Sequence, residues 1–311
     1  MLKKYDTIII GGGPAGLSAG IYAMRSRLKA VLIEKFMPGG QMMVADFIEN
    51  FPGFPAGIGG PELSMAMADQ AQSLGLEIIA SDCISADFSK EQKLVHTADG
   101  DFSAPTAIIA SGATPRRLMV PGEDRLTGKG VSYCATCDGA FFKDKEIAVA
   151  GGGNTAIQDA IFLTRFAKKV TILHRRDALR ATKILQERAL RNPKVEIAWN
   201  TVITEIKGKQ KVESITVKNV KDASLGMLPV DGIFVLIGTD PNTEFLRGQV
   251  VMDPSGYIIT NEEMETSMPG VYAAGDCRHK MLRQMLTAAA DGAIAATSAE
   301  QYIESLEDRD H

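Results

Sequence analysis

The feature that most restricts the fold of this chain is a strand–turn–helix pattern that occurs twice. The first copy begins with the apolar segment 6–10 and the second with the apolar segment 146–150. One constant spacing relates four pairs of positions: Gly11 and Gly151, Gly13 and Gly153, Gly16 and Ala156, and Glu34 and His174. A spacing kept over this length is stronger evidence than either glycine motif alone, and it indicates an internal duplication.

Apolar runs alternate with helical segments in both copies, a pattern typical of parallel sheets covered by helices. The expected strands are 6–10, 30–33, 107–112, 146–150, 170–173 and 234–238, and the expected helices are 17–26 and 157–166. We therefore predict an α/β fold of two Rossmann-like, doubly wound nucleotide-binding domains.

The second copy lies within the chain of the first. Another apolar run at 270–276 and a small-residue helix over about 286–297 follow the second copy, and they can complete the first domain. Proline-containing crossings are expected near 113–118 and 241–246. The predicted domains are 1–114 with 244–311, which binds one nucleotide, and 115–243, which binds the other and carries a cysteine pair.

Length and composition agree with two globular domains. The chain has 311 residues, 45% hydrophobic and 23% charged, and its net charge of −4 offers no electrostatic basis for binding nucleic acid or an anionic membrane. No apolar stretch is long enough to span a bilayer. The apolar start runs directly into the first glycine turn, so we expect a buried strand rather than a cleaved leader, and a cytoplasmic location.

The first glycine turn is suited to a dinucleotide. Gly11 permits the tight turn, Gly13 lets a pyrophosphate approach the helix N-terminus, and Gly16 lets the helix pack on the strand. Glu34 ends the next strand, where a carboxylate can bind ribose hydroxyls. The alternative is an ordinary strand–helix turn with a surface glutamate.

The second copy has His174, Arg175 and Arg176 where the first has its acid, with Arg180 one turn further on. A carboxylate would repel a 2′-phosphate, whereas guanidinium groups bind it in pairs of hydrogen bonds. The second site is therefore predicted to prefer NADP(H). The alternative is a solvated basic surface.

Cys134 and Cys137 are separated by two residues and followed by Asp138. Such a pair can open and close a disulfide, and a neighbouring carboxyl group can supply and recover the protons. The alternatives are buried packing cysteines or a zinc site, which would normally need four nitrogen or sulfur ligands. Cys83 and Cys277 have no such surroundings in the sequence, and we expect them in the core.

Two aromatic residues, Phe141 and Phe142, follow the cysteine pair. They are either core residues or anchors on which a protein partner docks.

Together these motifs resemble bacterial low-molecular-weight thioredoxin reductases over essentially the whole chain. The resemblance rests on residues 11–16, 39–41, 49–53, 134–139, 151–156, 174–177 with Arg180, 275–276 and 283–284. Larger reductases of the glutathione reductase type carry the cysteine pair in the first domain, so their order differs. The intact arginines argue against relatives that take electrons from ferredoxin.

The resemblance implies FAD in the first domain and NADPH in the second, and transfer of electrons to the disulfide and then to thioredoxin. It implies that Cys137 faces the flavin, Cys134 attacks the thioredoxin disulfide, and Asp138 is the acid–base group. It also implies a homodimer and a large rotation of the NADPH domain between two states.

The expected FAD contacts are Gly11, Gly13, Pro14, Ala15, Gly16, Glu34, Lys35, Gly40, Gln41, Asn50, Gly112, Asp276, Arg283 and Gln284. The expected NADPH contacts are Gly153, Asn154, Thr155, Ala156, His174, Arg175, Arg176, Arg180 and Gly238. No metal is expected.

Two positions depart from the family pattern: Gln158-Asp159 stands where two glutamates are common, and Cys277 where valine or alanine is familiar. Other functions remain open. The chain could be the flavoprotein of a peroxide-reducing system or serve another thioredoxin-like partner. The peroxide-linked relatives carry an N-terminal extension, which we do not expect here because the first domain starts within the first ten residues. A redox-sensing module without turnover would not need the intact cysteine–aspartate set.

Overall fold

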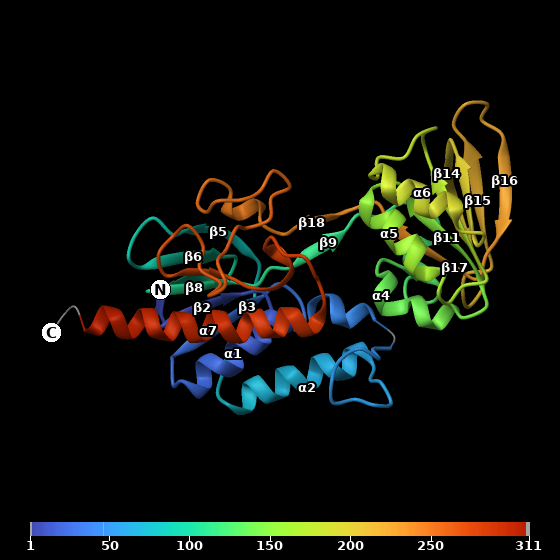
Figure 1. Cartoon of the computed structure of the whole chain (residues 1–311). Coiled ribbons are helices and arrows are strands. Elements are labelled where there is room, and N and C mark those ends of the chain that lie inside the picture. Colours follow the sequence, from blue (N-terminus) through green and yellow to red (C-terminus); the bar gives the residue numbers. More distant parts are fainter. Residues whose placement is uncertain (1, 46, 309–311) are drawn as a thin grey trace. The chain divides into compact units, whose positions relative to one another are not determined.

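The computed structural model describes residues 2–45 and 47–308. The chain divides into two compact units: Met1–Thr114 with Asp240–His311, and Pro115–Thr239 (Figure 1). The second unit is thus inserted in the chain of the first. The return to the first unit comes after Thr239 and not after 243, because the Asn242 backbone amide already donates to the Gly112 carbonyl at 3.0 Å.

The first unit contains β1 Lys3–Lys4, β2 Thr7–Ile10, α1 Pro14–Arg25, β3 Ala30–Glu34, the 3-10 helix η1 Gly40–Val44, α2 Gly60–Ser73, β4 Glu77–Ala80, β5 Cys83–Asp87, β6 Lys93–Thr97, β7 Gly100–Ala104, β8 Thr106–Ile109, and, beyond the insertion, η3 Glu244–Leu246, β19 Val271–Ala273, η4 Gly275–Cys277 and α7 Met285–Glu307. The crossing strands are β9 Ala113–Pro115 and β18 Thr239–Pro241, which pair in a two-stranded ribbon. The return crossing therefore lies ahead of the expected 241–246.

The second unit contains α3 Glu123–Leu126, β10 Val131–Ser132, α4 Ala135–Asp138, η2 Gly139–Phe142, β11 Glu146–Gly151, α5 Asn154–Leu163, β12 Lys169–His174, α6 Lys183–Arg191, β13 Val195–Trp199, β14 Thr201–Lys207, β15 Ser214–Asn219, β16 Leu225–Pro229 and β17 Gly232–Leu236.

Both units are built around a five-stranded parallel sheet with the same spatial order. The first sheet runs β19-β8-β2-β3-β4 and the second β10-β17-β11-β12-β13. The helices after the two glycine turns begin at Pro14 and Asn154, and the following strands end at Glu34 and His174, so the spacing seen in the sequence is kept in three dimensions. The duplicated α/β, Rossmann-like prediction is confirmed.

Each sheet is covered by helices on one face. In the first unit Ile9, Leu32 and Ile108 pack under α1 and α7, and in the second Val149 and Ile172 pack under α5. The neighbouring residues along these strands, such as Ile8 and Ala148, point to the opposite face of each sheet. Antiparallel sheets rather than helices cover that face. These covering sheets run β1-β7-β6-β5, in which β1 joins β7 in parallel, and β14-β15-β16.

The last helix, α7, is longer than the sequence indicated. It reaches Glu307 because no glycine or proline interrupts the chain after Gly292. Its small residues allow α1 to pack closely: a Cβ on Gly292 would lie 2.0 Å from the Ala15 carbonyl oxygen. Among the residues that the structure describes, no helix is long and apolar enough to cross a membrane.

Candidate functional site

The first glycine turn connects β2 to α1 and requires glycine for steric reasons. Gly11 has a φ of +107°, and a Cβ at Gly16 would lie 1.8 Å from the Gly11 carbonyl oxygen. Gly13 caps α1, Pro14 is its first residue and Ala15 follows. A Cβ at Gly13 would meet nothing within 4 Å, so there is open space beside the amide end of α1, where a dinucleotide fold binds phosphate.

Glu34 ends β3 with its carboxylate at this turn. Its Oε2 accepts a hydrogen bond from the Gly12 backbone amide at 2.6 Å, and its Oε1 accepts one from the Phe36 amide at 3.1 Å. The carboxylate is therefore where a dinucleotide fold places the acid that binds ribose hydroxyls. The Lys35 side chain is directed to another partner and not to this turn. Its Nζ forms an ion pair with the Asp82 carboxylate at 2.7 Å, and both side chains are exposed.

The segment 39–41 packs beside the same turn. The Gly39 amide donates to the Gly12 carbonyl at 2.7 Å, and a Cβ on Gly40, whose φ is +54°, would lie 3.2 Å from the Gly13 Cα. Gln41 is exposed. This segment therefore forms one wall next to the open end of α1.

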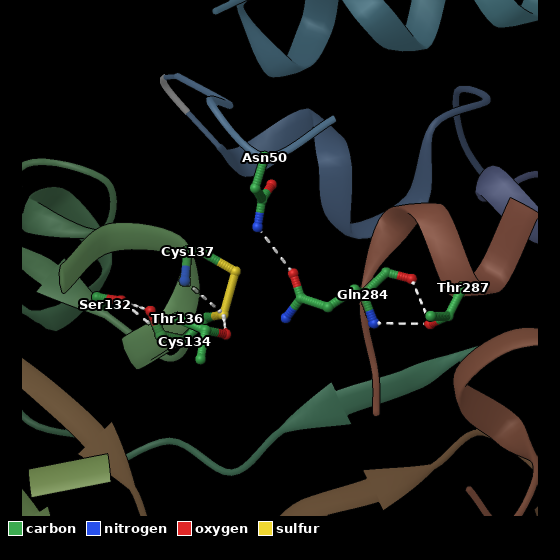
Figure 2. The surroundings of a disulfide bond; sticks show 7 residues. All are labelled: Asn50, Ser132, Cys134, Thr136, Cys137, Gln284 and Thr287. Carbon is green, nitrogen blue, oxygen red and sulfur yellow. Dashed lines mark hydrogen bonds between the residues drawn. A yellow bond between two sulfur atoms is a disulfide. The ribbon is translucent and has the colours of Figure 1, made fainter. Parts of the chain in front are cut away.

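Asn50 and Gln284, far apart in sequence, are joined directly. The side-chain amide of Asn50 donates through Nδ2 to the Gln284 Oε1 at 3.0 Å (Figure 2). Gln284 is also the N-cap of α7 and forms a capping box with Thr287. Both predicted FAD contacts thus lie at the start of the helix that packs on α1.

Asp276 lies in the turn after β19 and contains a buried acceptor that is not used. Its Oδ1 has no hydrogen-bond partner, and neither has the buried Ser111 hydroxyl, next to Gly112. Burial raises the pKa of Asp276, while Lys280 and Arg283 lower it. A buried carboxylate oxygen without a donor is suited to a ligand hydroxyl, which is what the sugar alcohol chain of FAD offers. The residues present fit that cofactor.

Arg283 lies beside Asp276 without a strong bond to it. Its guanidinium stacks on the Tyr257 ring at 4.0 Å, and its Nε is 3.5 Å from the Asp276 carbonyl oxygen.

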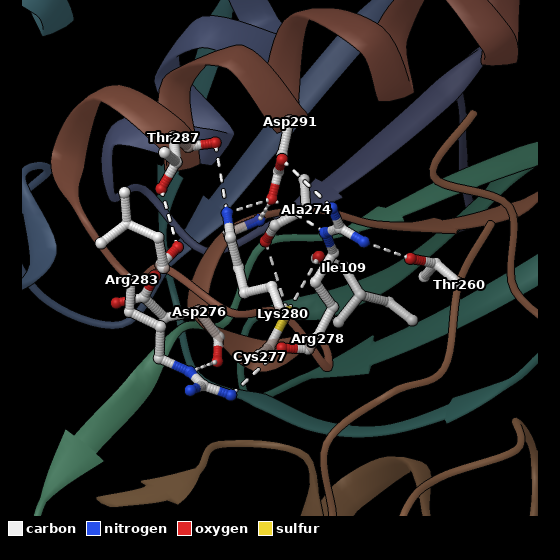
Figure 3. A network of polar contacts seen from close by, with 12 residues as sticks. Ile109, Thr260, Ala274, Asp276, Cys277, Arg278, Lys280, Arg283, Thr287 and Asp291 are labelled. Atoms are coloured by element: carbon white, nitrogen blue, oxygen red, sulfur yellow. Dashed lines mark hydrogen bonds and ion pairs between the residues drawn. The ribbon is translucent and has the colours of Figure 1, made fainter. Parts of the chain in front are cut away.

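A charged cluster that the sequence did not reveal holds this turn. The Asp291 carboxylate accepts from the Gly275 amide at 3.0 Å, from Arg278 Nε at 2.9 Å and from Lys280 Nζ at 2.6 Å (Figure 3). All three charged side chains are largely buried. Lys280 lies in the loop before α7 and Asp291 lies within that helix, so no single helical or strand period relates them, and the sequence did not indicate that one carboxylate receives both cations.

The second glycine turn repeats the first. Gly153 caps α5 with nothing within 4 Å of its Cβ position, and Ala156 takes the place of Gly16. The Asn154 Oδ1 accepts from the Thr182 amide at 2.8 Å, and Thr155 is exposed. There is therefore open space beside the amide end of α5 as well.

His174 is buried and does not reach the surface as a phosphate ligand would. Its Nδ1 lies 3.1 Å from the Gly151 carbonyl oxygen and its Nε2 lies 3.0 Å from that of Ala178. Both ring nitrogens face the backbone, so His174 connects the loop 175–180 to the glycine turn, and its expected contact with a nucleotide stays a prediction. The Arg180 amide adds a bond to the Gly152 carbonyl at 2.8 Å.

The arginines on this loop are available for a phosphate. Arg175, Arg176 and Arg180 are all exposed. Gly238, also an expected contact, directly precedes the second crossing; its φ is +117°, and a Cβ there would lie 3.5 Å from the Arg116 side chain.

Cys134 and Cys137 form a disulfide across the start of α4, with their Cα atoms 5.3 Å apart (Figure 2). Cys134 is the N-cap of α4, and its Sγ accepts from the Cys137 amide at 3.2 Å. Asp138 ends α4, and its amide donates to the Cys134 carbonyl at 3.2 Å. Both cysteines are half-buried.

The two phenylalanines after the disulfide differ. Phe142 is 7% exposed and packs edge-on against Phe234 with ring centroids 5.2 Å apart, so it is a core residue and not a docking anchor. Phe141 is 38% exposed.

The other two cysteines belong to the first unit and are not bonded to each other. Cys277 is fully buried, as expected, and burial raises its pKa to about 11. Cys83 is only partly buried against the core, and burial raises its pKa to about 12.

Comparison with known proteins agrees with this geometry. Residues 5–292 match the family model described as pyridine nucleotide-disulphide oxidoreductase. Thioredoxin reductases of Peptoclostridium litorale and Listeria innocua are 47% and 46% identical; each match covers 98% of this chain, and 99% and 96% of the relative. The crystal structure of thioredoxin reductase from Streptococcus pyogenes has a TM-score of 0.94 at 47% identity, covering 97% of this chain and 99% of that one. The chain belongs to the pyridine nucleotide-disulphide oxidoreductase family, among its thioredoxin reductases.

Proposed function

We propose that this oxidoreductase is an NADPH-dependent thioredoxin-disulfide reductase that uses FAD and the Cys134–Cys137 pair. The observation that carries the proposal is the disulfide at the start of α4, which packs on α5, the helix that begins at the second glycine turn. A reducible disulfide and a nucleotide turn in one unit are two of the parts that such a reaction needs.

The resemblance to thioredoxin reductases implies a task for each of the three groups at α4, and the steps balance in electrons and protons. Reduction of the disulfide takes two electrons and two protons and yields two thiols. The thiolate of Cys134 then attacks the thioredoxin disulfide and forms a mixed disulfide, and the Cys137 thiolate attacks Cys134 to release reduced thioredoxin and restore the bond. Asp138, adjacent to Cys137, gives and recovers the protons.

FAD would be held in the first unit. Bound FAD supplies two-electron transfer between a nicotinamide and a disulfide. The open end of α1 would bind the pyrophosphate, Glu34 the ribose, and the unpartnered Asp276 oxygen a hydroxyl of the sugar alcohol chain. Asn50, Gln284 and Arg283 would contact the remainder of the cofactor.

NADPH would be held in the second unit. The open end of α5 would bind its pyrophosphate, and Arg175, Arg176 and Arg180 would bind its 2′-phosphate. His174 would hold the arginine loop in place.

For the partner and assembly, we propose thioredoxin as substrate, with the exposed Phe141 ring as one contact, and a homodimer as the working assembly.

The deciding experiment is purification, an absorbance spectrum and measurement of NADPH consumption with candidate thioredoxins. We expect a flavin spectrum, consumption only when an oxidised thioredoxin is present, and a clear preference for NADPH over NADH. Equal catalytic efficiency with the two nucleotides, or consumption with a peroxide-linked thioredoxin-like protein but with no thioredoxin, would reject this proposal.

A further inference from the structure

Residues just after the first crossing are linked to the residue just before the disulfide by one buried carboxylate. Glu123, the first residue of α3, is 2% exposed. Its Oε1 accepts from the Tyr133 hydroxyl at 2.9 Å and from the Leu118 amide at 2.9 Å, and its Oε2 accepts from the Met119 amide at 2.8 Å. One side chain therefore binds two separate segments of the second unit.

The segment next to the crossing needs this support. Met119 has a φ of +58°, a left-handed conformation that is unfavourable for a residue with a side chain, and its side chain is 83% exposed. Side-chain packing therefore does little to hold it, and the bond from its amide to Glu123 fixes the backbone instead.

Tyr133 connects this support to the redox centre. It lies between the end of β10 and Cys134, and its hydroxyl also receives a bond from Arg117 Nε at 3.3 Å. Arg117 adds an ion pair with Asp124 in α3. Burial raises the pKa of the Tyr133 hydroxyl above its ordinary value, so it remains a donor to Glu123 through the neutral pH range.

We infer that Glu123 and Tyr133 are positioning residues that fix the Cys134–Cys137 segment relative to the chain entering the second unit. The dithiol reacts with partners that are not part of this unit. Its position relative to the connection between the units therefore determines where it meets them. This consequence for turnover rests on the proposed function; the anchoring itself does not.

The anchoring changes the balance between disulfide and dithiol. When Tyr133 is held, the backbone at Cys134 stays fixed after the bond opens, so the dithiol gains little freedom and the ring closes again easily. Without the hydroxyl, the open form gains freedom and is favoured.

The test variant is Tyr133→Phe, which removes only the hydroxyl. Glu123 Oε1 keeps the Leu118 amide, so no buried oxygen loses its last donor and the protein is expected to fold with FAD bound. The control is Tyr22→Phe, an exposed tyrosine of α1 in the first unit. Glu123→Gln is a second variant, expected to act in the same direction.

The first readout uses no turnover. The flavin-loaded proteins are equilibrated with mixtures of reduced and oxidised glutathione, and the thiols at 134 and 137 are alkylated and quantified by peptide mass. We expect the disulfide of Tyr133→Phe to be half-reduced at a ratio of reduced to oxidised glutathione about fivefold lower than in the control. This is the effect expected from the loss of one hydrogen bond. A shift of less than twofold relative to Tyr22→Phe would overturn the inference.

The second readout separates the half-reactions. The rate at which NADPH bleaches the flavin should equal that of the control, while thioredoxin reduction falls about fivefold. Equal slowing of both would show that the contact supports the unit as a whole, and would also overturn the inference. Failure of the unmodified protein to consume NADPH with thioredoxin would reject the proposed function, and the glutathione measurement would still decide this point.

Discussion

At the scale of single residues, the proposed chemistry rests on three neighbours at α4. Cys134 caps the helix, Cys137 lies one turn later and Asp138 ends it. The cap places the Cys137 amide 3.2 Å from the Cys134 sulfur, so a thiolate at Cys134 would receive a backbone hydrogen bond. That contact favours Cys134 as the group that attacks a partner disulfide.

Replacing Asp138 with Asn should leave a folded, flavin-containing protein that reduces thioredoxin slowly. The amide keeps the shape of the carboxyl group and cannot carry its proton, and general acid–base help contributes typically about 10²–10⁴-fold. The measurement is the rate of thioredoxin reduction at saturating NADPH, with flavin content as the control. An unchanged rate would remove Asp138 from the reaction.

The two cysteines should behave differently when replaced one at a time. Cys137→Ser leaves Cys134 able to form a mixed disulfide with thioredoxin that nothing can release, whereas Cys134→Ser should trap none. Non-reducing electrophoresis and peptide mass identify the bond, and flavin reduction by NADPH in both variants is the control. Trapping through Cys137 alone would reverse the assigned roles.

At the scale of elements, the loop between β12 and α6 combines a buried histidine with exposed arginines. His174 contacts two backbone carbonyl oxygens, and the loop amides at 180 and 181 both donate to the Gly152 carbonyl. The arginines are thus carried on a loop that is fixed to the glycine turn, so their charge is held close to the nucleotide site.

Neutral replacements of Arg175 and Arg176 together should weaken NADPH binding at least tenfold and spare NADH. Each charge-assisted bond to the 2′-phosphate contributes about 1.5–3 kcal/mol, and NADH lacks this phosphate. Catalytic efficiency with both nucleotides measures the effect. A parallel loss with NADH would mean that the arginines serve the loop and not the phosphate.

The buried carboxyl group of Asp159 on α5 makes the free energy of unfolding depend on pH. Burial raises its pKa from 3.8 to about 6, so the folded state favours the neutral acid. The stability that the neutral acid contributes to the folded state is fully present below about pH 4 and is lost as the pH rises through about 6. Asp159→Asn should therefore be more stable than the unmodified protein by about 1 kcal/mol above pH 6, after allowance for its exposed part. Thermal unfolding at pH 4 and pH 8 tests this: a difference that is the same at both would exclude titration of Asp159 as the cause.

At the scale of the whole molecule, the two units have separate cores. Each buried cluster among the described residues draws on one unit alone. Since each unit buries its own apolar surface, a ligand that binds one unit should stabilise mainly that unit.

Removal of FAD should lower the unfolding temperature of the first unit, because Asp276 then keeps a buried oxygen without a donor. Added FAD should restore it, whereas 2′,5′-ADP should raise only the transition of the second unit. With a ligand at 100 times its dissociation constant, the stabilisation is about 2.7 kcal/mol. Differential scanning calorimetry resolves the transitions; an equal shift of both by either ligand would show that the units unfold as one.

The local pattern of the chain was sufficient for the duplicated sheets, the glycine turns and the cysteine pair. Strand and helix periods, the spacing of glycines in a turn, and a Cys-x-x-Cys spacing are properties of neighbouring residues, so they are visible in one dimension. The expected ends of elements were less accurate: α1 begins at Pro14 and α7 continues to Glu307, because capping and packing determine where helices end.

Contacts between distant segments could not be predicted in this way. The burial of His174 between two carbonyls, the separation of Phe142 in the core from Phe141 at the surface, and the several groups joined by the carboxylates of Asp291 and Glu123 have no fixed sequence spacing. Such contacts depend on how the sheets and helices stack, since a side chain's partner across a layer is set by packing and not by its neighbours along the chain.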